Sequence, residues 1–285
     1  MSFHSPNTAL PFRLWKEMPQ KIRDTSPVVH CMTNYVTACW CADMLLAAGA
    51  APIMADEPGE MEEIVAIAGA LVLNIGTFNK SHFGAMRRAA TQAKRLGKPI
   101  LLDPVGAGAS RIRTEAALSL LDEYRPAVVR GNISEILALA GRSETSRGVE
   151  ADPESLVSAD RLDAGAELAV FLAKKWECVV AISGPFDIIS DGQRTCAIGG
   201  GDPMMTRITG CGCMQSALIG AYLAVEPDPW SATAVPFSVM SLCGAQAARA
   251  TRTASEGTGS FRVRFLDQIT NFLGSRLANT EAKML

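Results

Sequence analysis

Residues 70–108 read ALVLNIGTFNKSHFGAMRRAATQAKRLGKPILLDPVGAG, and this stretch decides the fold class. Two apolar runs, 70–75 and 99–103, are separated by a segment whose apolar residues recur every three or four positions from Phe83 to Leu96, just before Gly97. That recurrence is typical of a helix with one face on a core, and glycine is common just beyond a helix end. The order strand, helix, strand predicts two parallel strands joined by a helix that packs on the sheet.

The same alternation continues on both sides of this unit. Further strands are predicted at 28–32, 51–54, 127–130 and 178–183. After them, two short apolar runs, 186–190 and 193–198, flank Asp191-Gly192, a dipeptide suited to a tight hairpin turn. Helical stretches follow at 212–224, 230–251 and 261–277. We therefore predict an α/β fold with a central, largely parallel sheet flanked by helices, a β-hairpin and a helical C-terminal third.

Composition and charge restrict the possible partners. The 285 residues, 48% of them hydrophobic, fit a single domain over 1–285, with 1–24 as an N-terminal tail and first helix region. The formal net charge is -2, and basic and acidic residues are interspersed along the chain. No basic stripe is therefore available to bind nucleic acid. The longest apolar stretches, such as 217–225, are too short for a membrane span, and 1–17 lacks the apolar core of a signal peptide. We predict a soluble, cytoplasmic protein without a membrane partner.

Two other features have ordinary interpretations. The eight cysteines are scattered, and neither close pair, Cys39/Cys41 or Cys211/Cys213, has zinc-site spacing or a histidine cluster beside it. Reduced and mostly buried thiols are therefore favoured over disulfides or a structural zinc. Residues 142–160 are rich in Ser, Glu and Gly and lack hydrophobic periodicity, which predicts a surface loop.

Residues 206–213, TRITGCGC, carry the strongest functional signal. They join the glycine-rich turn 199–201 to an amphipathic helix, and Gly210 and Gly212 allow a sharp turn and a close approach to a ligand. The first amides of a helix have no partner within it and, together with the helix dipole, attract anions such as phosphate. A helix that simply begins at a glycine turn has the same pattern, so the surroundings must decide.

Polar residues after the predicted strands supply those surroundings, because ligands of an open parallel sheet bind beyond the carboxyl ends of its strands. Asp103 ends one strand and Glu135 follows another, where two carboxylates could hold Mg²⁺. Alternatively, Asp103 is a turn former and Glu135 an acidic residue of a first helical turn. Arg130 ends an apolar strand and is either solvated or directed at an anion such as a nucleotide phosphate.

Four segments together resemble one protein family. The turn Gly210-Cys-Gly-Cys213 resembles the Gly-x-Gly-Asp phosphate-binding turn of ribokinase-like kinases, and a cysteine at the aspartate position resembles the hydroxyethylthiazole kinase family. The other three segments are Asn74-Ile-Gly-Thr77, Leu102-Asp-Pro-Val-Gly-Ala-Gly108 and Val129-Arg-Gly-Asn-Ile-Ser-Glu135. The resemblance runs from about residue 28 to residue 243.

The resemblance implies a ribokinase-like fold and transfer of the γ-phosphate of ATP, with Mg²⁺, to the alcohol of 5-(2-hydroxyethyl)-4-methylthiazole in thiamine biosynthesis or salvage. Catalytic roles would fall to Gly210, Cys211, Gly212 and Cys213. ATP would be bound by Arg130, Asn132 and Ser183, and the metal by Asp103 and Glu135. The thiazole would contact Asn34, Met54 and Gly210, although core packing is the ordinary interpretation of Met54. The family also implies a homotrimer with sites near subunit interfaces.

Some alternatives stay open at this point. The helix start would lower the pKa of Cys213 and a bound polyphosphate would oppose that shift, and the sequence does not decide between them. A kinase of another alcohol, such as hydroxymethylpyrimidine, or an ATP-dependent dehydratase could use the same scaffold. The resemblance argues against the pyrimidine kinases, whose glycine turn has aspartate at the position of Cys213. A non-catalytic sensor of the thiazole or the nucleotide would not need the complete set of charged residues.

Overall fold

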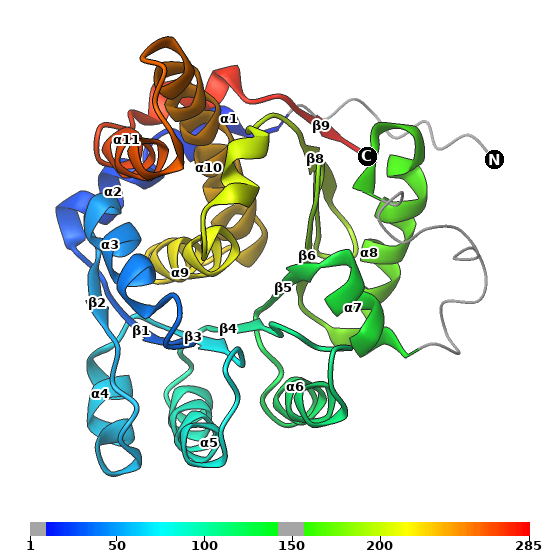
Figure 1. The fold of residues 1–285 in the computed structure, drawn as a ribbon. Helices are drawn as coiled ribbons and strands as arrows, with labels where there is room; N and C mark the ends of the chain where they lie inside the picture. Colours follow the sequence, from blue (N-terminus) through cyan, green and yellow to red (C-terminus); the bar gives the residue numbers. More distant parts are fainter. Residues whose placement is uncertain (1–9, 142–156) are drawn as a thin grey trace.

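The computed structural model describes residues 10–141 and 157–285, and its centre is a nine-stranded sheet of order β2-β1-β3-β4-β5-β6-β7-β8-β9 (Figure 1). Six strands pair in parallel: β1 Val28–Met32, β2 Ala51–Ile53, β3 Ala70–Asn74, β4 Ile100–Asp103, β5 Val128–Asn132 and β6 Val179–Ser183. Three more continue the sheet in antiparallel pairing: β7 Asp187–Ser190, β8 Thr195–Ile198 and β9 Ala282–Met284. The predicted α/β class with a largely parallel sheet is confirmed.

Helices cover both faces of the sheet (Figure 1). One face carries α3 Ala38–Ala48, α9 Cys211–Leu223, α10 Pro229–Thr253 and α11 Thr258–Thr270, with the short α1 Phe12–Trp15 and α2 Met18–Thr25 beside them. The other face carries α4 Met61–Ile67, α5 Lys80–Arg95, α6 Arg111–Tyr124, α7 Ile133–Ala140 and α8 Leu162–Trp176. Short 3₁₀ helices lie at Pro58–Glu60, Ala159–Arg161, Pro203–Arg207 and Gly274–Asn279.

Alternate side chains of the central strands enter two separate apolar cores. In β3, Ala70 and Val72 belong to the core under α9 and α10, whereas Leu71 and Leu73 belong to the core over α5 and α6. A strand covered on both faces needs a continuous apolar run rather than an alternating one. This requirement explains why residues 70–73 are all apolar.

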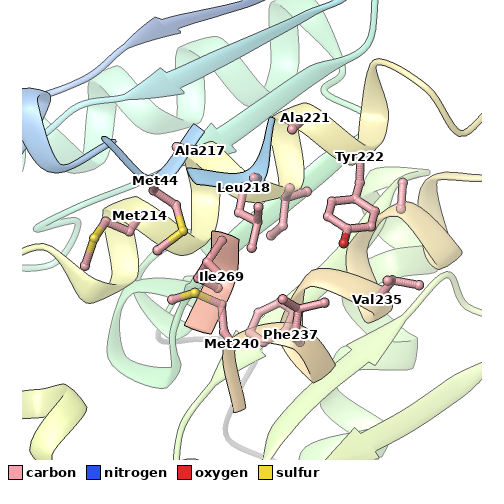
Figure 2. Packing of buried hydrophobic residues seen from close by; sticks show 14 of the residues in the cluster. Met44, Met214, Ala217, Leu218, Ala221, Tyr222, Val235, Phe237, Met240 and Ile269 are labelled. Atoms are coloured by element: carbon pink, nitrogen blue, oxygen red, sulfur yellow. The ribbon is translucent and has the colours of Figure 1, made fainter. Parts of the chain in front are cut away.

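Helix α9 lies inside its layer and is enclosed on every side. Figure 2 shows Leu218 and Tyr222 of α9 among side chains of α3, α10 and α11, including Met44, Phe237 and Ile269. Every residue from Met214 to Leu223 is buried. The apolar packing therefore fixes the position of the N-terminus of α9 relative to the sheet.

The structure also corrects several predicted boundaries. The hairpin is confirmed, but Ser190 pairs with Thr195, so its loop spans 191–194, because the Asp191 carboxylate accepts the amides of Gln193 and Arg194. Strand β5 continues two residues past Arg130, and the last long helix ends at Thr270 rather than at residue 277. Strand β9 was not predicted. Of the predicted loop 142–160, residues 142–156 lie outside the described residues.

None of the helices within 10–141 and 157–285 combines the length and the apolar character needed to cross a membrane. All eight cysteines lie in the described part of the chain and are free thiols. Five are buried, Cys211 and Cys213 are partly buried and Cys39 is exposed.

Candidate functional site

A cavity of about 440 Å³ opens where the carboxyl ends of β1, β3, β4, β5 and β6 meet the N-terminus of α9. Its lining consists of Asn34, Val36, Thr37, Gly76, Thr77, Val105, Arg113, Arg130, Asn132, Glu135, Ser183, Gly210, Gly212 and Cys213. Segments that are far apart in the sequence therefore meet here, as expected for the ligand site of a parallel sheet. Most of the residues expected to act in catalysis or ligand binding are among them.

Two glycines at the start of α9 lie close to side chains that line the cavity. Gly210 has φ +87°, and a Cβ there would lie 2.8 Å from Cγ2 of Thr37. Gly212 lies against Arg130, because a Cβ at position 212 would be 2.8 Å from Nη1 of that guanidinium. The start of a 13-residue helix and an arginine side chain thus meet at this wall of the cavity. Both attract anions.

Arg130 is 9% exposed and is held between two neighbouring strands. Its Nη2 donates to Oγ of Ser183 at 2.9 Å, and its Nη1 lies 4.0 Å from Oδ2 of Asp103. The Arg130 side chain therefore lines the cavity and is largely shielded from solvent, and its role in binding an anion stays a prediction.

Asp103 is fully buried beneath Arg130. Its Oδ2 accepts hydrogen bonds from Nδ2 of Asn74 at 2.8 Å and from Oγ of Ser216 at 2.7 Å. Its Oδ1 has no hydrogen-bond partner among the described residues. Burial raises the pKa of this carboxyl to about 6, and the Arg130 guanidinium opposes the shift. A buried carboxylate oxygen without a donor is suited to a cation or its water shell.

Glu135 has a structural role at the start of α7 and also faces the cavity. Its Oε2 accepts the amide of Asn132 and its Oε1 accepts the amide of Gly106, both at 2.9 Å. Asn132 in turn caps the helix by accepting the amide of Glu135 at 2.8 Å. This capping box means that the interpretation as a first-turn acidic residue is correct, and that any metal role of Glu135 uses the remaining lone pairs of these oxygens.

Cys213, in the first turn of α9, lies against side chains from the end of β3 and from the loop after β1. Its Sγ accepts hydrogen bonds from Nδ2 of Asn34 and of Asn74, each at 3.3 Å. Burial raises the pKa of this thiol to about 11, and the negative charge of Asp103 adds to the shift. Desolvation therefore outweighs the side-chain hydrogen bonds that favour the thiolate, and Cys213 is a neutral thiol near pH 7.

Three of the expected site residues do not line the cavity: Met54, Cys211 and the fully buried Asp103. Met54 directly follows β2, and Cys211 is the first residue of α9. Both are partly buried against the apolar core under α9 and α10, and neither lines the cavity. Their expected functional roles stay predictions.

Sequence reasoning assigned no role to several residues of this region, among them Asn74, Ser216, Thr37 and Arg113. Asn74 lies in one of the motif segments, and Ser216 lies one helical turn after Cys213, so both had a weak signal. Thr37 and Arg113 had none, because nothing in their sequence neighbourhood distinguishes a cavity residue from a surface residue.

Comparisons with known proteins agree with this geometry. Residues 20–274 match the hydroxyethylthiazole kinase family. A hydroxyethylthiazole kinase of Clostridium acetobutylicum is 42% identical over 263 residues, which cover 92% of this chain and 96% of that protein.

Solved structures extend the comparison. A hydroxyethylthiazole kinase protein of Pyrococcus horikoshii superposes with a TM-score of 0.84 and 34% identity, covering 96% of this chain and 99% of that one. A ribokinase-like superfamily protein of Enterococcus faecalis, at 13% identity and a TM-score of 0.55 over 93% of each chain, shares the fold alone. The chain therefore belongs to the hydroxyethylthiazole kinase family and has a ribokinase-like fold.

Proposed function

We propose that the protein transfers the γ-phosphoryl group of ATP to the hydroxyl of 5-(2-hydroxyethyl)-4-methylthiazole, a step of thiamine biosynthesis or salvage. One observation carries the proposal. The glycine turn of α9 and the Arg130 guanidinium meet at one wall of a cavity whose lining also includes Asn34 and Cys213. The family supports the activity and the substrate, since its name is that of a kinase of hydroxyethylthiazole.

The nucleotide phosphates belong at the Arg130 and Ser183 side of the cavity. Arg130 offers a planar fork of donors, and Asn132 and Gly212 border the same space. The amides at the start of α9 can stabilise the charge that develops on the transferred group. Phosphoryl transfer has a loose transition state, so positioning and electrostatics provide most of the acceleration.

The alcohol belongs at the Asn34 and Cys213 side. Cys213 is a neutral thiol at physiological pH, so it does not remove the proton of the alcohol as a thiolate base. Its Sγ and the Asn34 amide instead form a polar wall beside Gly210 against which the hydroxyl is oriented. A strong base is less necessary for phosphoryl transfer than for acyl transfer. In a loose transition state little bonding to the nucleophile has formed, so its proton need not yet be removed.

A magnesium ion fits the donors present. The free Oδ1 of Asp103 and the Glu135 carboxylate facing the cavity are hard oxygen donors, the type that Mg²⁺ takes, usually with several waters retained. When bound, the ion would neutralise charge on the phosphates of ATP. The raised pKa of Asp103 reflects its burial, and a cation nearby would favour its ionised form.

We also propose a cytoplasmic homotrimer in which Met54 completes the alcohol side of a neighbouring subunit's cavity. Tyr35 and Val36, next to Asn34, are 80% and 53% exposed, and Val36 lines the cavity. An apolar rim of this kind is suited to a subunit contact. The free cysteines fit a reducing compartment. Light scattering tests the assembly, and a monomer at micromolar concentration would contradict this arrangement.

The decisive experiment measures ATP consumption with Mg²⁺ and each of two alcohols, hydroxyethylthiazole and hydroxymethylpyrimidine. We expect turnover with the thiazole and a kcat/KM for the pyrimidine that is lower by about 100-fold or more. A site shaped for one ring binds the transition state of a poorly matched ring less tightly by several kcal/mol. Preferential turnover of the pyrimidine would replace the proposed substrate. Thiazole binding without any ATP consumption would instead indicate a sensor.

A further inference from the structure

Arg113 is a second arginine that lines the cavity, in addition to Arg130. It belongs to the first turn of α6, and its side chain lies across the loop that joins β4 to α6. A Cβ at Gly106, where φ is +78°, would overlap the guanidinium of Arg113 and lie 3.1 Å from its Cδ. The glycine therefore leaves the space in which the arginine extends to the cavity wall.

The charge of Arg113 is unpaired within the described part of the chain. No carboxylate there lies within 4.0 Å of its guanidinium. Glu135, the acidic residue of the same cavity, accepts two backbone amides instead. Arg111, two positions earlier on α6, contrasts with it, because Arg111 is 89% exposed at its side chain and pairs with Glu115 at 3.5 Å.

The position of Arg113 relative to α9 indicates which ligand would complete it. Helix α6 packs on the face of the sheet opposite to α9 (Figure 1). Arg113 from α6 and the amides at the start of α9 thus approach one cavity from the two faces of the sheet. An elongated anion with several charged oxygens could contact both, whereas a single phosphate monoester bound at α9 would leave Arg113 unused.

We infer that Arg113 binds the polyphosphate of a nucleoside triphosphate, acting from the β4–α6 side of the cavity while α9 and Arg130 act from the other. The inference rests on the proposed kinase function and deepens it. Arg113 would contact the β- or γ-phosphate and would be a binding residue of the nucleotide rather than of the alcohol.

The test compares Arg113→Met with the matched control Arg111→Met, which removes the same charge from the same helical turn outside the cavity. Calorimetry with ATP, ADP and AMP gives the dissociation constants, and steady-state kinetics gives KM and kcat. In Arg113→Met we expect Kd for ATP and ADP to rise about 10- to 100-fold, as for loss of charge-assisted hydrogen bonds, with Kd for AMP unchanged. Arg111→Met should leave all three constants within about twofold of wild type.

Two further measurements separate binding from a structural role in the loop. Arg113→Lys should recover part of the ATP affinity, because it restores the charge without the fork. The thermal midpoint without nucleotide should be the same in Arg113→Met as in wild type, while the upward shift caused by ATP should shrink.

Several results would overturn the inference. An unchanged Kd for ATP in Arg113→Met, with an active wild type, would show that Arg113 does not contact the polyphosphate. Equal losses for AMP, ADP and ATP would assign it a role in holding the loop. If the wild-type protein binds no nucleotide at all, the proposed function fails together with the inference, and that outcome is recognised before any variant is compared.

Discussion

The proposed phosphate side and the proposed alcohol side of the cavity differ in how their residues are brought together. At the phosphate side, Asn132 and Ser183 are register partners at the ends of β5 and β6, so strand pairing itself places them side by side. At the alcohol side, Asn34 and Cys213 come from a loop and a helix, and Met54 follows β2 at the sheet edge without reaching the cavity. Strand ends in one sheet are predictable neighbours, whereas loop, helix and edge residues meet only through packing.

The largest effect should come from the phosphate side. Gly212→Val places a branched side chain against the Arg130 guanidinium, and we expect kcat/KM to fall by about 100-fold or more, as when a donor to transition-state charge is lost. Gly84→Ala is the control, because a Cβ at position 84 meets nothing within 4 Å. Kinetics and thermal unfolding on both variants would check this. A loss no larger than that of Cys213→Ala would mean that the anion site contributes no more to catalysis than the thiol does.

Cys213 tests the alcohol side directly. Because its thiol is neutral, Cys213→Ala should lower kcat by less than about tenfold, well under the usual contribution of a general base. Cys213→Asp should retain or raise turnover, since the amides of Asn34 and Asn74 can donate to a carboxylate at this position. Single-turnover assays with both variants measure this. Complete loss in Cys213→Asp with ATP binding intact would contradict this assignment.

Met54 should have a smaller effect that depends on assembly. If a neighbouring subunit uses it against the thiazole, Met54→Ala should raise KM for the thiazole about threefold and leave KM for ATP unchanged, in line with loss of part of a buried contact. Leu46→Ala is the control, since Leu46 is an exposed apolar residue of the adjacent α3. A change in thermal stability with an unchanged KM would show that Met54 only packs in the core.

The pH dependence of kcat should be the same with and without the Cys213 thiol. Burial raises its pKa to about 11, so the thiolate fraction stays small up to about pH 9. We expect the kcat ratio of wild type to Cys213→Ala to stay constant within about twofold from about pH 7 to 9. A thiolate base would make the ratio rise with pH, because deprotonation increases steadily below the pKa. Stopped-time assays at several pH values would distinguish the two cases.

Sequence patterns alone predicted the parallel strands, the hairpin, the C-terminal helices and the residues of the proposed phosphate side. Short apolar runs between helical periods predict buried parallel strands. The ends of such strands share one edge, so Asp103, Arg130 and Ser183 could be assigned to one region from the sequence alone. The glycine turn before α9 was equally visible, because sharp turns restrict the residue types that fit.

Three features became clear from the three-dimensional structure alone: the neutral thiol of Cys213, the two backbone amides bound by Glu135 and the place of Arg113 at the cavity. Each depends on what surrounds the side chain in space: burial for the thiol, a loop amide for Glu135 and the space above Gly106 for Arg113. Desolvation and long-range contacts arise from packing between segments that are far apart in the chain. Local sequence patterns therefore do not predict them.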